Sequence, residues 1–337
     1  MKRGDGPTRP TYPTAFVHPL GPLFRHLPIA LRRHLLFLRA HKKWGNFRAP
    51  KTWREKMQWR ILNDRRTILS VACDKLAQKD FIARELLSKG LQEDVRVPEV
   101  YWVGTDVREL ATLASRLPAR WVLKPNHSSG RVRLLDSEEH AIDWDDLIAA
   151  GDRWLQPDEE TIVFGHSGYL GARRLLIAEE RIGSGESAPD DFRLSCSHGR
   201  LRLAAWSRGY GTPEYWAAGY ERDLTTRHEK FLLHELEATT PTAMDTLAQE
   251  EKLRLTAVAE VISQPLDHVR VDFYFEDGVI WFSELTVYSN SGLAPLDDEE
   301  NLKFGEYWSL PDLTAPDPCE AEWRALLEGV PKGTLQR

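Results

Sequence analysis

The chain has 337 residues, of which 42% are apolar and 28% are charged; this composition is typical of globular proteins and excludes a largely disordered chain. The three cysteines lie far apart without a CxxC spacing, which excludes a disulfide framework and a cysteine-based zinc site. No apolar run approaches the roughly 20 residues that span a bilayer, and the start MKRGDGPTRP lacks the apolar core of a signal peptide. We therefore expect a cytoplasmic protein.

Charge is unevenly distributed along the chain. Residues 1–66 contain 16 Lys and Arg against three acidic residues, a net charge of +13, whereas the remainder has 29 basic and 48 acidic residues, a net charge of −19. A basic block of this kind is typical of a segment that contacts a polyanion, a membrane surface or an acidic partner. The alternative is that this block folds onto the acidic remainder of its own chain. No recognised nucleic-acid motif accompanies the charge, so we expect no nucleic-acid partner.

The first elements are predicted to be an extended arm and a basic helix. Residues 1–22 are rich in proline and show no periodicity, which indicates an extended arm. Pro28 suits a first helical turn. Apolar residues then recur at helical spacing while arginines occupy other faces, so the pattern predicts a basic amphipathic helix. The apolar positions are Leu27, Leu31, Leu35 and Leu38, and the arginines are Arg32, Arg33 and Arg39.

Helices then give way to short strands. A second helix is predicted over residues 52–64 with Thr52 as its cap, and a third over residues 74–90, ended by Gly90. From Val95 the apolar pattern becomes that of strands, and a further helix is predicted between two hairpins. The predicted strands cover residues 95–104, 120–125, 132–135 and 175–182; the hairpins cover residues 190–206, turning at His198 and Gly199, and 268–288, and the helix covers 242–263.

The second hairpin carries charged residues within apolar strands. We predict a three-residue turn over residues 276–278, which places Arg270 opposite Glu284 and Asp272 diagonally from Glu284 on the same face. Two neighbouring carboxylates repel unless a cation lies between them, and hard oxygen ligands suit Mg²⁺ that bridges phosphate oxygens. Arg270 would add positive charge for a phosphoryl group. The alternative is a purely structural pair between arginine and carboxylate.

A lysine at a strand end offers a second candidate site. Lys124 ends the apolar strand RWVLKP and precedes the small polar loop 126–130, an arrangement suited to phosphates through the ammonium group and backbone N–H donors. The alternative is an ordinary surface turn. No GxxxxGK[ST] motif occurs, and no GxGxxG motif follows a predicted strand, which argues against a Walker or dinucleotide site.

Two further groups of polar residues border predicted strands. Glu179 and Glu180 end an apolar strand and suit an adenine edge, which needs an apolar slot with a donor and an acceptor; the alternative is two solvated glutamates. Asp191 and Arg193 could contact a ribose or a phosphate, or could be ordinary polar residues of a hairpin.

Taken in chain order, these pieces resemble a known superfamily. They are DK at Asp74 and Lys75, VLKP, a small-residue loop, IAEE, RVDF and SELT. This order is similar to the ATP-grasp superfamily, in particular its D-alanine ligase members. The helix EKMQWRILNDRR, the loop KPNHSSG and the segment SELTVYSNSG resemble the TupA-like ATP-grasp family more closely, over about residues 50–312. The resemblance implies an α+β ATP-grasp fold, in which two α+β subdomains clamp ATP, with a basic helical N-terminal extension.

The resemblance also implies domain boundaries. Residues 1–68 would form the basic, mainly helical extension, and residues 313–337 a C-terminal tail. The ATP-grasp domain would cover residues 69–312, with a flap or lid subdomain over about 121–183 and a metal-binding subdomain over about 184–312. Related enzymes usually carry a Rossmann-like domain before the DK helix, and the basic segment shows no such βαβ pattern. The site of the acceptor is therefore unassigned.

Roles for individual residues follow from the same resemblance. Lys75 and Lys124 would hold the α- and β-phosphates of ATP; Ser128, Ser129 and Gly130 would form the flap over the β- and γ-phosphates; Glu179, Glu180 and Ile182 would form the adenine hinge, and Asp191 would contact the ribose. Arg270 and Lys124 would be catalytic, and Asp272, Glu284 and Thr286 would bind Mg²⁺. The usual E-x-N metal pair is here Glu284 and Thr286, so the second metal has a weaker ligand unless Asn290 takes part.

The implied reaction is ATP-dependent ligation of a carboxylate and an amine through an acylphosphate. By resemblance, the substrates are small-molecule or polymer-linked carboxylates and amines, such as those of a cell-surface polysaccharide or a peptide-like metabolite. The basic N-terminus could contact an anionic membrane or the acceptor. Phosphoryl transfer to a hydroxyl or a histidine is one alternative, and a nucleotide-binding module without turnover is another.

Overall fold

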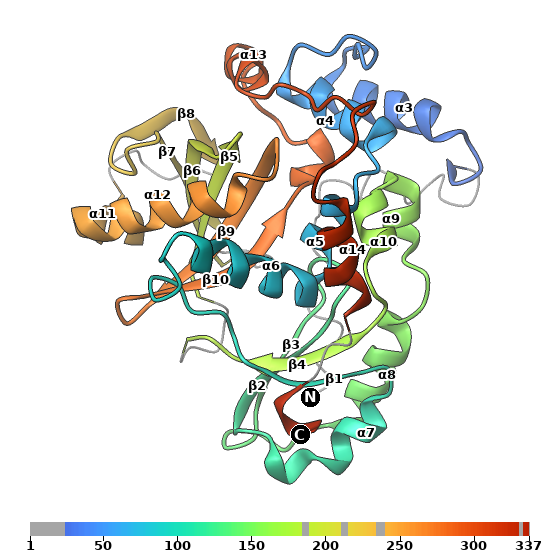
Figure 1. Cartoon of the computed structure of the whole chain (residues 1–337), viewed down its shortest axis with the longest axis vertical. Coiled ribbons are helices and arrows are strands. Elements are labelled where there is room, and N and C mark those ends of the chain that lie inside the picture. The colour runs from blue at the N-terminus through green and yellow to red at the C-terminus, as the bar shows by residue number, and fades with distance from the viewer. Residues whose placement is uncertain (1–23, 184–188, 210–214, 234–239, 330–332, 337) are drawn as a thin grey trace.

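Two antiparallel sheets form the framework of the protein in a computed structural model that describes residues 24–183, 189–209, 215–233, 240–329 and 333–336 (Figure 1). The four-stranded sheet has the order β1 (Val100–Gly104), β4 (Leu176–Glu180), β2 (Arg120–Pro125) and β3 (Arg133–Asp136). The six-stranded sheet has the order β10 (Val279–Thr286), β9 (His268–Glu276), β5 (Asp191–Ser197), β6 (Arg200–Arg208), β7 (Trp216–Tyr220) and β8 (Arg227–Leu233). The predicted α+β class is confirmed.

Helices surround both sheets. They are α3 (Ile29–His41), α4 (Trp53–Asn63), α5 (Thr67–Cys73), α6 (Lys75–Ser88), α7 (Val107–Thr112), α8 (Trp144–Trp154), α9 (Glu159–Phe164), α10 (Ser167–Gly171), α11 (Ala243–Thr246), α12 (Gln249–Ser263), α13 (Asp298–Glu306) and α14 (Glu320–Glu328). The predicted cap at Thr52 is confirmed, because its side chain accepts the N–H of Glu55 in a capping box. Within the described ranges, no helix combines the length and apolar character needed to cross a membrane.

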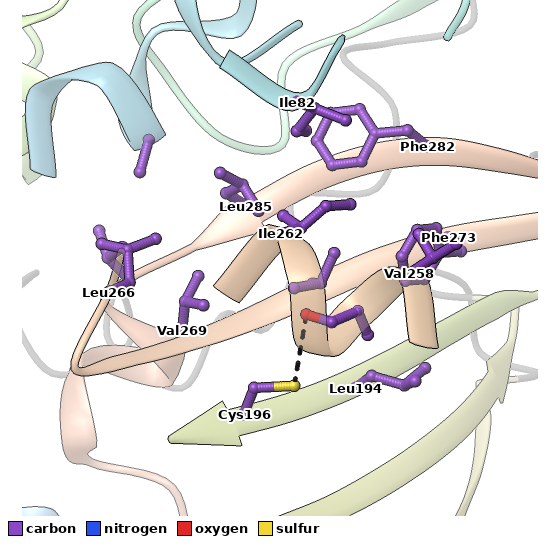
Figure 2. Packing of buried hydrophobic residues seen from close by; sticks show 14 of the residues in the cluster. Ile82, Leu194, Cys196, Val258, Ile262, Leu266, Val269, Phe273, Phe282 and Leu285 are labelled. Carbon is purple, nitrogen blue, oxygen red and sulfur yellow. Dashed lines mark hydrogen bonds between the residues drawn. The ribbon is translucent and has the colours of Figure 1, made fainter. Parts of the chain in front are cut away.

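The main core lies on one face of the six-stranded sheet. Val269, Val271 and Phe273 of β9 are buried there against α12, and Figure 2 shows Val258 and Ile262 of that helix among them. The thiol of Cys196 in β5 also lies 3.9 Å from the carbonyl of Ala259 in the helix. The predicted apolar face of the strand is thus a core face, which leaves its opposite face for polar side chains.

Helix α6 contacts both sheets and lies between them (Figure 1). Leu76 packs with Val103 and Ile177 of the four-stranded sheet. On the other side, the side-chain amide oxygen of Gln78 accepts the backbone N–H of Leu285 in β10 at 2.9 Å. Residues at the start of α6 are therefore fixed relative to both sheets.

The turn between β9 and β10 differs from the prediction. It contains two residues, Asp277 and Gly278, with φ of 52° and 74°, and the strands pair Glu276 with Val279. Both turn residues adopt the left-handed region that two-residue hairpin turns require, which an Asp-Gly pair tolerates. The predicted three-residue turn was therefore wrong.

A β-bulge at Ser283 compensates for this shorter turn. The ladder pairs Phe282 with Phe273 and then Glu284 with Asp272, so Ser283 is an extra residue. Without it, the alternation of side chains would place Glu284 on the apolar face. The predicted pairing of Arg270 with Glu284 was wrong, but the bulge returns Glu284 to the polar face that the prediction gave it.

Helix α3 packs in an orientation that the sequence did not predict. Arg32 and Arg33 are buried together with Leu36 and Phe37, whereas three leucines of the predicted core stripe face outward. Arg33 donates to the carbonyl of Ser291 at 2.7 Å and to the carbonyl of Phe164 at 3.4 Å. Unpaired buried carbonyls are costly, and a guanidinium group supplies five donors in this position. Hydrogen bonding therefore decides which face of α3 is buried.

A buried charge network joins α4 to the six-stranded sheet. Arg60 donates to the carboxylate of Asp267 at 2.8 Å and to the carbonyls of His268 and Val287 at 2.8 and 3.0 Å. Arg66 donates to the other oxygen of Asp267 at 2.6 Å. Arg60 and Arg66 of the motif EKMQWRILNDRR thus have a structural role: they hold the helical segment against β9 and β10.

His268 lies in this network as a buried, neutral ring. Its Nε2 accepts the indole N–H of Trp53 at 2.9 Å, and its Nδ1 lies 2.9 Å from the hydroxyl oxygen of Ser197. Burial, together with the nearby charge of Arg60, lowers the pKa of His268 to about 3. The geometry agrees with a neutral ring. Nε2 of His268 accepts the Trp53 indole N–H, and a charged ring would carry a proton on Nε2 that the indole cannot accept.

We expect the protein to lose stability in acid partly through His268. Because the folded-state pKa lies below the unfolded value of about 6.5, the neutral His268 ring stabilises the folded protein fully above that pH. This stabilisation is lost as the pH falls toward the folded pKa, and the loss is about 2 kcal/mol near pH 5. Urea unfolding at pH about 7 and about 5 should show a smaller acid-induced loss in His268→Gln than in the wild type, because glutamine keeps both hydrogen bonds without titrating. Equal losses in the two proteins would contradict the assignment.

Candidate functional site

The first part of the candidate site is the start of α6. The carboxylate of Asp74 caps the helix by accepting the N–H of Leu76 and Ala77, and Arg173 donates to both of its oxygens at 2.7 and 2.8 Å. Asn126 accepts the same Leu76 N–H at 2.9 Å through its side chain. These contacts fix the beginning of α6 against the loop that follows β2, and thereby position Lys75.

Lys75 is buried between the two sheets. Its ammonium group donates to the carbonyl of Ser128 in the loop after β2. Burial lowers the pKa of Lys75, the charge of Lys124 acts in the same direction, and Glu284 and Glu179 oppose both. The ammonium group is therefore in electrostatic range of charges from both sheets.

Glu179, on the four-stranded sheet, contacts two lysines. Its carboxylate is buried and contacts the ammonium group of Lys124 on the neighbouring strand β2 through one oxygen, while Lys79 lies 3.1 Å from the other. Burial raises the pKa of Glu179, but the two lysines outweigh it and the net shift is downward. Lys79 was not predicted; its spacing of four residues from Lys75 on one helix was the available signal.

The loop after β2 presents one buried hydroxyl. Within the described part of the chain, the Oγ of Ser128 has no hydrogen-bond partner although the residue is buried. Ser129 and Gly130 are exposed, and Gly130 has a left-handed φ of 73°. A buried hydroxyl without a partner is costly unless a ligand completes it. Ser128 therefore fits an anionic oxygen at this position.

Three further predicted residues border the strands. Glu180 is partly buried and accepts the backbone N–H of Glu99 at 3.1 Å. Ile182 is partly buried just after β4. Asp191 accepts a hydrogen bond of 2.7 Å from Arg193, and Arg193 lies opposite Asp272 across β5 and β9. This strand position places Arg193 on the face that carries the acidic residues.

The second part of the candidate site is the polar face of β9 and β10. Arg270 donates to both oxygens of Asp272 at 2.7 and 2.5 Å, and to the hydroxyl of Thr286 at 3.1 Å. The same hydroxyl lies 3.4 Å from an oxygen of Asp272 and 3.4 Å from an oxygen of Glu284. The structure thus brings all four predicted residues together. Asn290 is exposed in a 3₁₀ turn over Ser289–Gly292, with a φ of 44°.

Negative charge at this face is only partly neutralised. The pKa of Asp272 is raised to about 6, because burial, to which the charge of Glu284 adds, outweighs the opposing effect of Arg270. Burial lowers the pKa of Arg270, but the neighbouring Asp272 carboxylate outweighs this effect, and the net shift is upward. Two carboxylates and a hydroxyl provide hard oxygen ligands, which fit Mg²⁺. No group of three acidic, His or Cys side chains suited to a metal occurs in the described ranges, so phosphate and water oxygens would complete such a site.

The predicted residues thus form two facing groups. Lys75, Lys124 and Ser128 belong to the first, and Arg270, Asp272, Glu284 and Thr286 to the second. Helix α6 connects them, because it begins at Lys75 and the side-chain oxygen of Gln78 accepts the backbone N–H of Leu285, next to Glu284, at 2.9 Å. Cations of one group facing carboxylates of the other can hold a polyphosphate together with a divalent cation.

Solved structures with a similar chain arrangement include several ligases. A D-alanine–D-alanine ligase from Bacillus anthracis is 14% identical, with a TM-score of 0.40, over 77% of this chain and 67% of that one. An N5-carboxyaminoimidazole ribonucleotide synthetase in complex with ADP is 14% identical, with a TM-score of 0.41, over 65% and 46%. The ATP-grasp ligase PsnB, in complex with a minimal precursor, Mg and ADP, is 13% identical, with a TM-score of 0.35, over 81% and 65%.

The family of the chain follows from its sequence. No match was found among curated proteins. The family described as TupA-like ATPgrasp matches residues 55–309, well over half of the chain. This match agrees with the motifs around Lys75, Lys124 and Arg270 and confirms the predicted ATP-grasp fold. The chain therefore belongs to the TupA-like ATP-grasp family.

Proposed function

We propose that this protein is an ATP-dependent ligase that joins a carboxylate to an amine. The observation that carries the proposal is the arrangement of two lysines, Lys75 and Lys124, facing an Arg270–Asp272–Glu284 cluster on a second sheet. Membership in the ATP-grasp family supports the same function. An arrangement of this kind suits phosphoryl transfer, in which positioning and electrostatic stabilisation supply most of the catalysis.

The four-stranded sheet, the loop after β2 and the start of α6 would bind ATP. Lys75 and Lys124 would hold the α- and β-phosphates, and the Ser128 hydroxyl would donate to a phosphate oxygen. The remaining predicted contacts would be Ser129 and Gly130 over the phosphates, Glu179, Glu180 and Ile182 at the adenine, and Asp191 at the ribose. Because Lys124 is paired with Glu179 without a nucleotide, phosphate would have to share its ammonium group with that carboxylate.

The six-stranded sheet would hold Mg²⁺ and the γ-phosphoryl group of ATP. Asp272, Glu284 and Thr286 would bind Mg²⁺, which when bound supplies positive charge to the phosphates. Arg270 would steady the γ-phosphoryl group through its guanidinium. A carboxylate oxygen of the substrate attacks the γ-phosphorus while the bond to the bridging oxygen breaks and ADP leaves. The amine nitrogen then attacks the acyl carbon, phosphate departs, and the nitrogen loses a proton to solvent.

The acceptor chemistry follows from the resemblance stated for the sequence motifs. We infer that the substrates are small-molecule or polymer-linked carboxylates and amines, with cell-surface polysaccharide or peptide-like metabolites as the classes to test first. No protein nucleophile is needed, because phosphorylation converts a carboxylate, a poor electrophile at neutral pH, into an acyl group with a good leaving group.

Product analysis tests the proposed reaction. The full chain is incubated with ATP, Mg²⁺ and pairs of carboxylates and amines from the two substrate classes, and products are identified by mass spectrometry. We expect ADP, phosphate and an amide in equal amounts. ADP with a phosphorylated alcohol or a phosphorylated protein histidine would show a kinase instead, and nucleotide binding without ADP would show a module without turnover. Either result would contradict the proposal.

A further inference from the structure

One face of α3 exposes apolar side chains. Leu31, Leu35 and Leu38 recur at helical spacing and are 41%, 37% and 38% exposed, because the buried face of the helix carries Arg32 and Arg33 instead. The helix lies at the edge of the molecule, next to α9 (Figure 1). Contiguous exposed apolar side chains on a helix indicate a contact with another surface.

Trp44 extends this face just beyond the helix. Its side chain is 61% exposed. Its ring stacks on His34 with a centroid separation of 4.8 Å, and His34 stacks in turn on the buried ring of Phe47 at 4.1 Å. The stack fixes the orientation of a large exposed aromatic ring. An amphipathic ring held in this way is typical of residues at the boundary between lipid and water.

The segment that carries the apolar face is basic. Residues 24–54 contain nine Lys and Arg and no Asp or Glu. Three of the nine, Arg32, Arg33 and Arg54, are buried. The exposed ones are Arg25, Arg39, Lys42, Lys43, Arg48 and Lys51. Lys43 forms an ion pair with Asp298 of α13, so part of the basic block does fold onto the acidic body, while all six of these side chains remain exposed.

We propose that α3 and Trp44 dock this protein on an anionic membrane surface. The leucines and the indole ring would enter the boundary between headgroups and acyl chains, and the exposed cations of residues 24–54 would contact lipid phosphates. A helix face that exposes apolar side chains suits a lipid surface, and the absence of acidic residues from residues 24–54 matches negative headgroups. The inference does not depend on the reaction proposed above, since none of these residues belongs to the candidate site.

Cosedimentation with vesicles tests this proposal. The full chain should bind vesicles of equimolar phosphatidylcholine and phosphatidylglycerol and should bind pure phosphatidylcholine far less. The triple variant Leu31→Ser, Leu35→Ser, Leu38→Ser should bind about tenfold more weakly or worse. Replacing Lys42 and Arg48 with Gln should weaken binding and reduce its dependence on salt.

A matched control distinguishes this face from general hydrophobicity. Leu87, Leu253 and Leu302 are 66%, 60% and 44% exposed on other helices, and replacing all three with Ser should leave vesicle binding unchanged. Melting temperature and ATP affinity should be unchanged in both triple variants. The proposal is overturned if the wild type does not bind the mixed vesicles, or if both triple variants lose binding equally. It is also overturned if the leucines instead hold two copies together in sedimentation.

Discussion

Replacing Glu284 with Gln should lower the rate of ADP formation by about a hundredfold to a thousandfold, because it removes one of two charges proposed to hold Mg²⁺ while keeping the shape of the side chain. The structure makes this substitution selective. Arg270 is paired with Asp272 rather than with Glu284, so the ion pair on β9 survives. The amide can still contact the Thr286 hydroxyl, which lies 3.4 Å from Glu284.

Steady-state kinetics at saturating and limiting Mg²⁺ measure this effect. The loss should be greatest when Mg²⁺ is limiting, and the melting temperature should change little. Glu276→Gln is the matched control, since Glu276 lies at the far end of the same hairpin, beside the turn, and its substitution should leave turnover unchanged. Normal turnover of Glu284→Gln at limiting Mg²⁺ would refute the metal site and leave a structural cluster in its place.

Replacing Lys124 with Ala should weaken ATP binding by about tenfold to a hundredfold, since the loss of a charge-assisted hydrogen bond costs about 1.5 to 3 kcal/mol. The Glu179 carboxylate, which contacts Lys124, keeps a cationic partner in the variant, because Lys79 still lies 3.1 Å from it. The fold should therefore persist with some loss of stability. Isothermal titration calorimetry with ATP provides the affinity.

Lys79→Met provides the control for this substitution. It removes the other cation on Glu179 but keeps the pair between Lys124 and Glu179. We expect this variant to lose stability, since Lys79 also donates to the carbonyl of Pro98 at 2.8 Å, and to keep most of its ATP affinity. Equal losses of affinity in both variants would show that the effect acts through Glu179, and wild-type affinity in Lys124→Ala would place the nucleotide elsewhere.

Local chemistry allowed several elements to be predicted from the sequence. The strand RWVLKP is β2, from Arg120 to Pro125, because a continuous apolar run bounded by Pro predicts a buried strand. The turn at His198 and Gly199 is confirmed, with both residues at positive φ, as a two-residue hairpin requires. These features depend on neighbouring residues alone, and so sequence patterns carry them.

Other features depend on contacts between distant segments and could not be predicted. The bulge at Ser283 inserts one residue into an otherwise regular alternation, and nothing in the sequence marks where the extra residue falls. The buried face of α3 is set by carbonyls of Phe164 and Ser291 that need donors from Arg33, more than a hundred residues away in the chain. The pairing of Lys124 with Glu179 likewise required knowing that β2 and β4 are neighbours.

Trapping with hydroxylamine tests the central claim of carboxylate activation most directly, because it does not require the natural amine. The full chain is incubated with ATP, Mg²⁺, a panel of carboxylates and hydroxylamine, and ADP and hydroxamate are quantified. If an acylphosphate forms, hydroxylamine attacks its acyl carbon, and ADP and hydroxamate should appear in equal amounts with a carboxylate that the enzyme accepts. ADP formation that depends on a substrate hydroxyl, with a phosphate ester as product and no hydroxamate, would contradict the account.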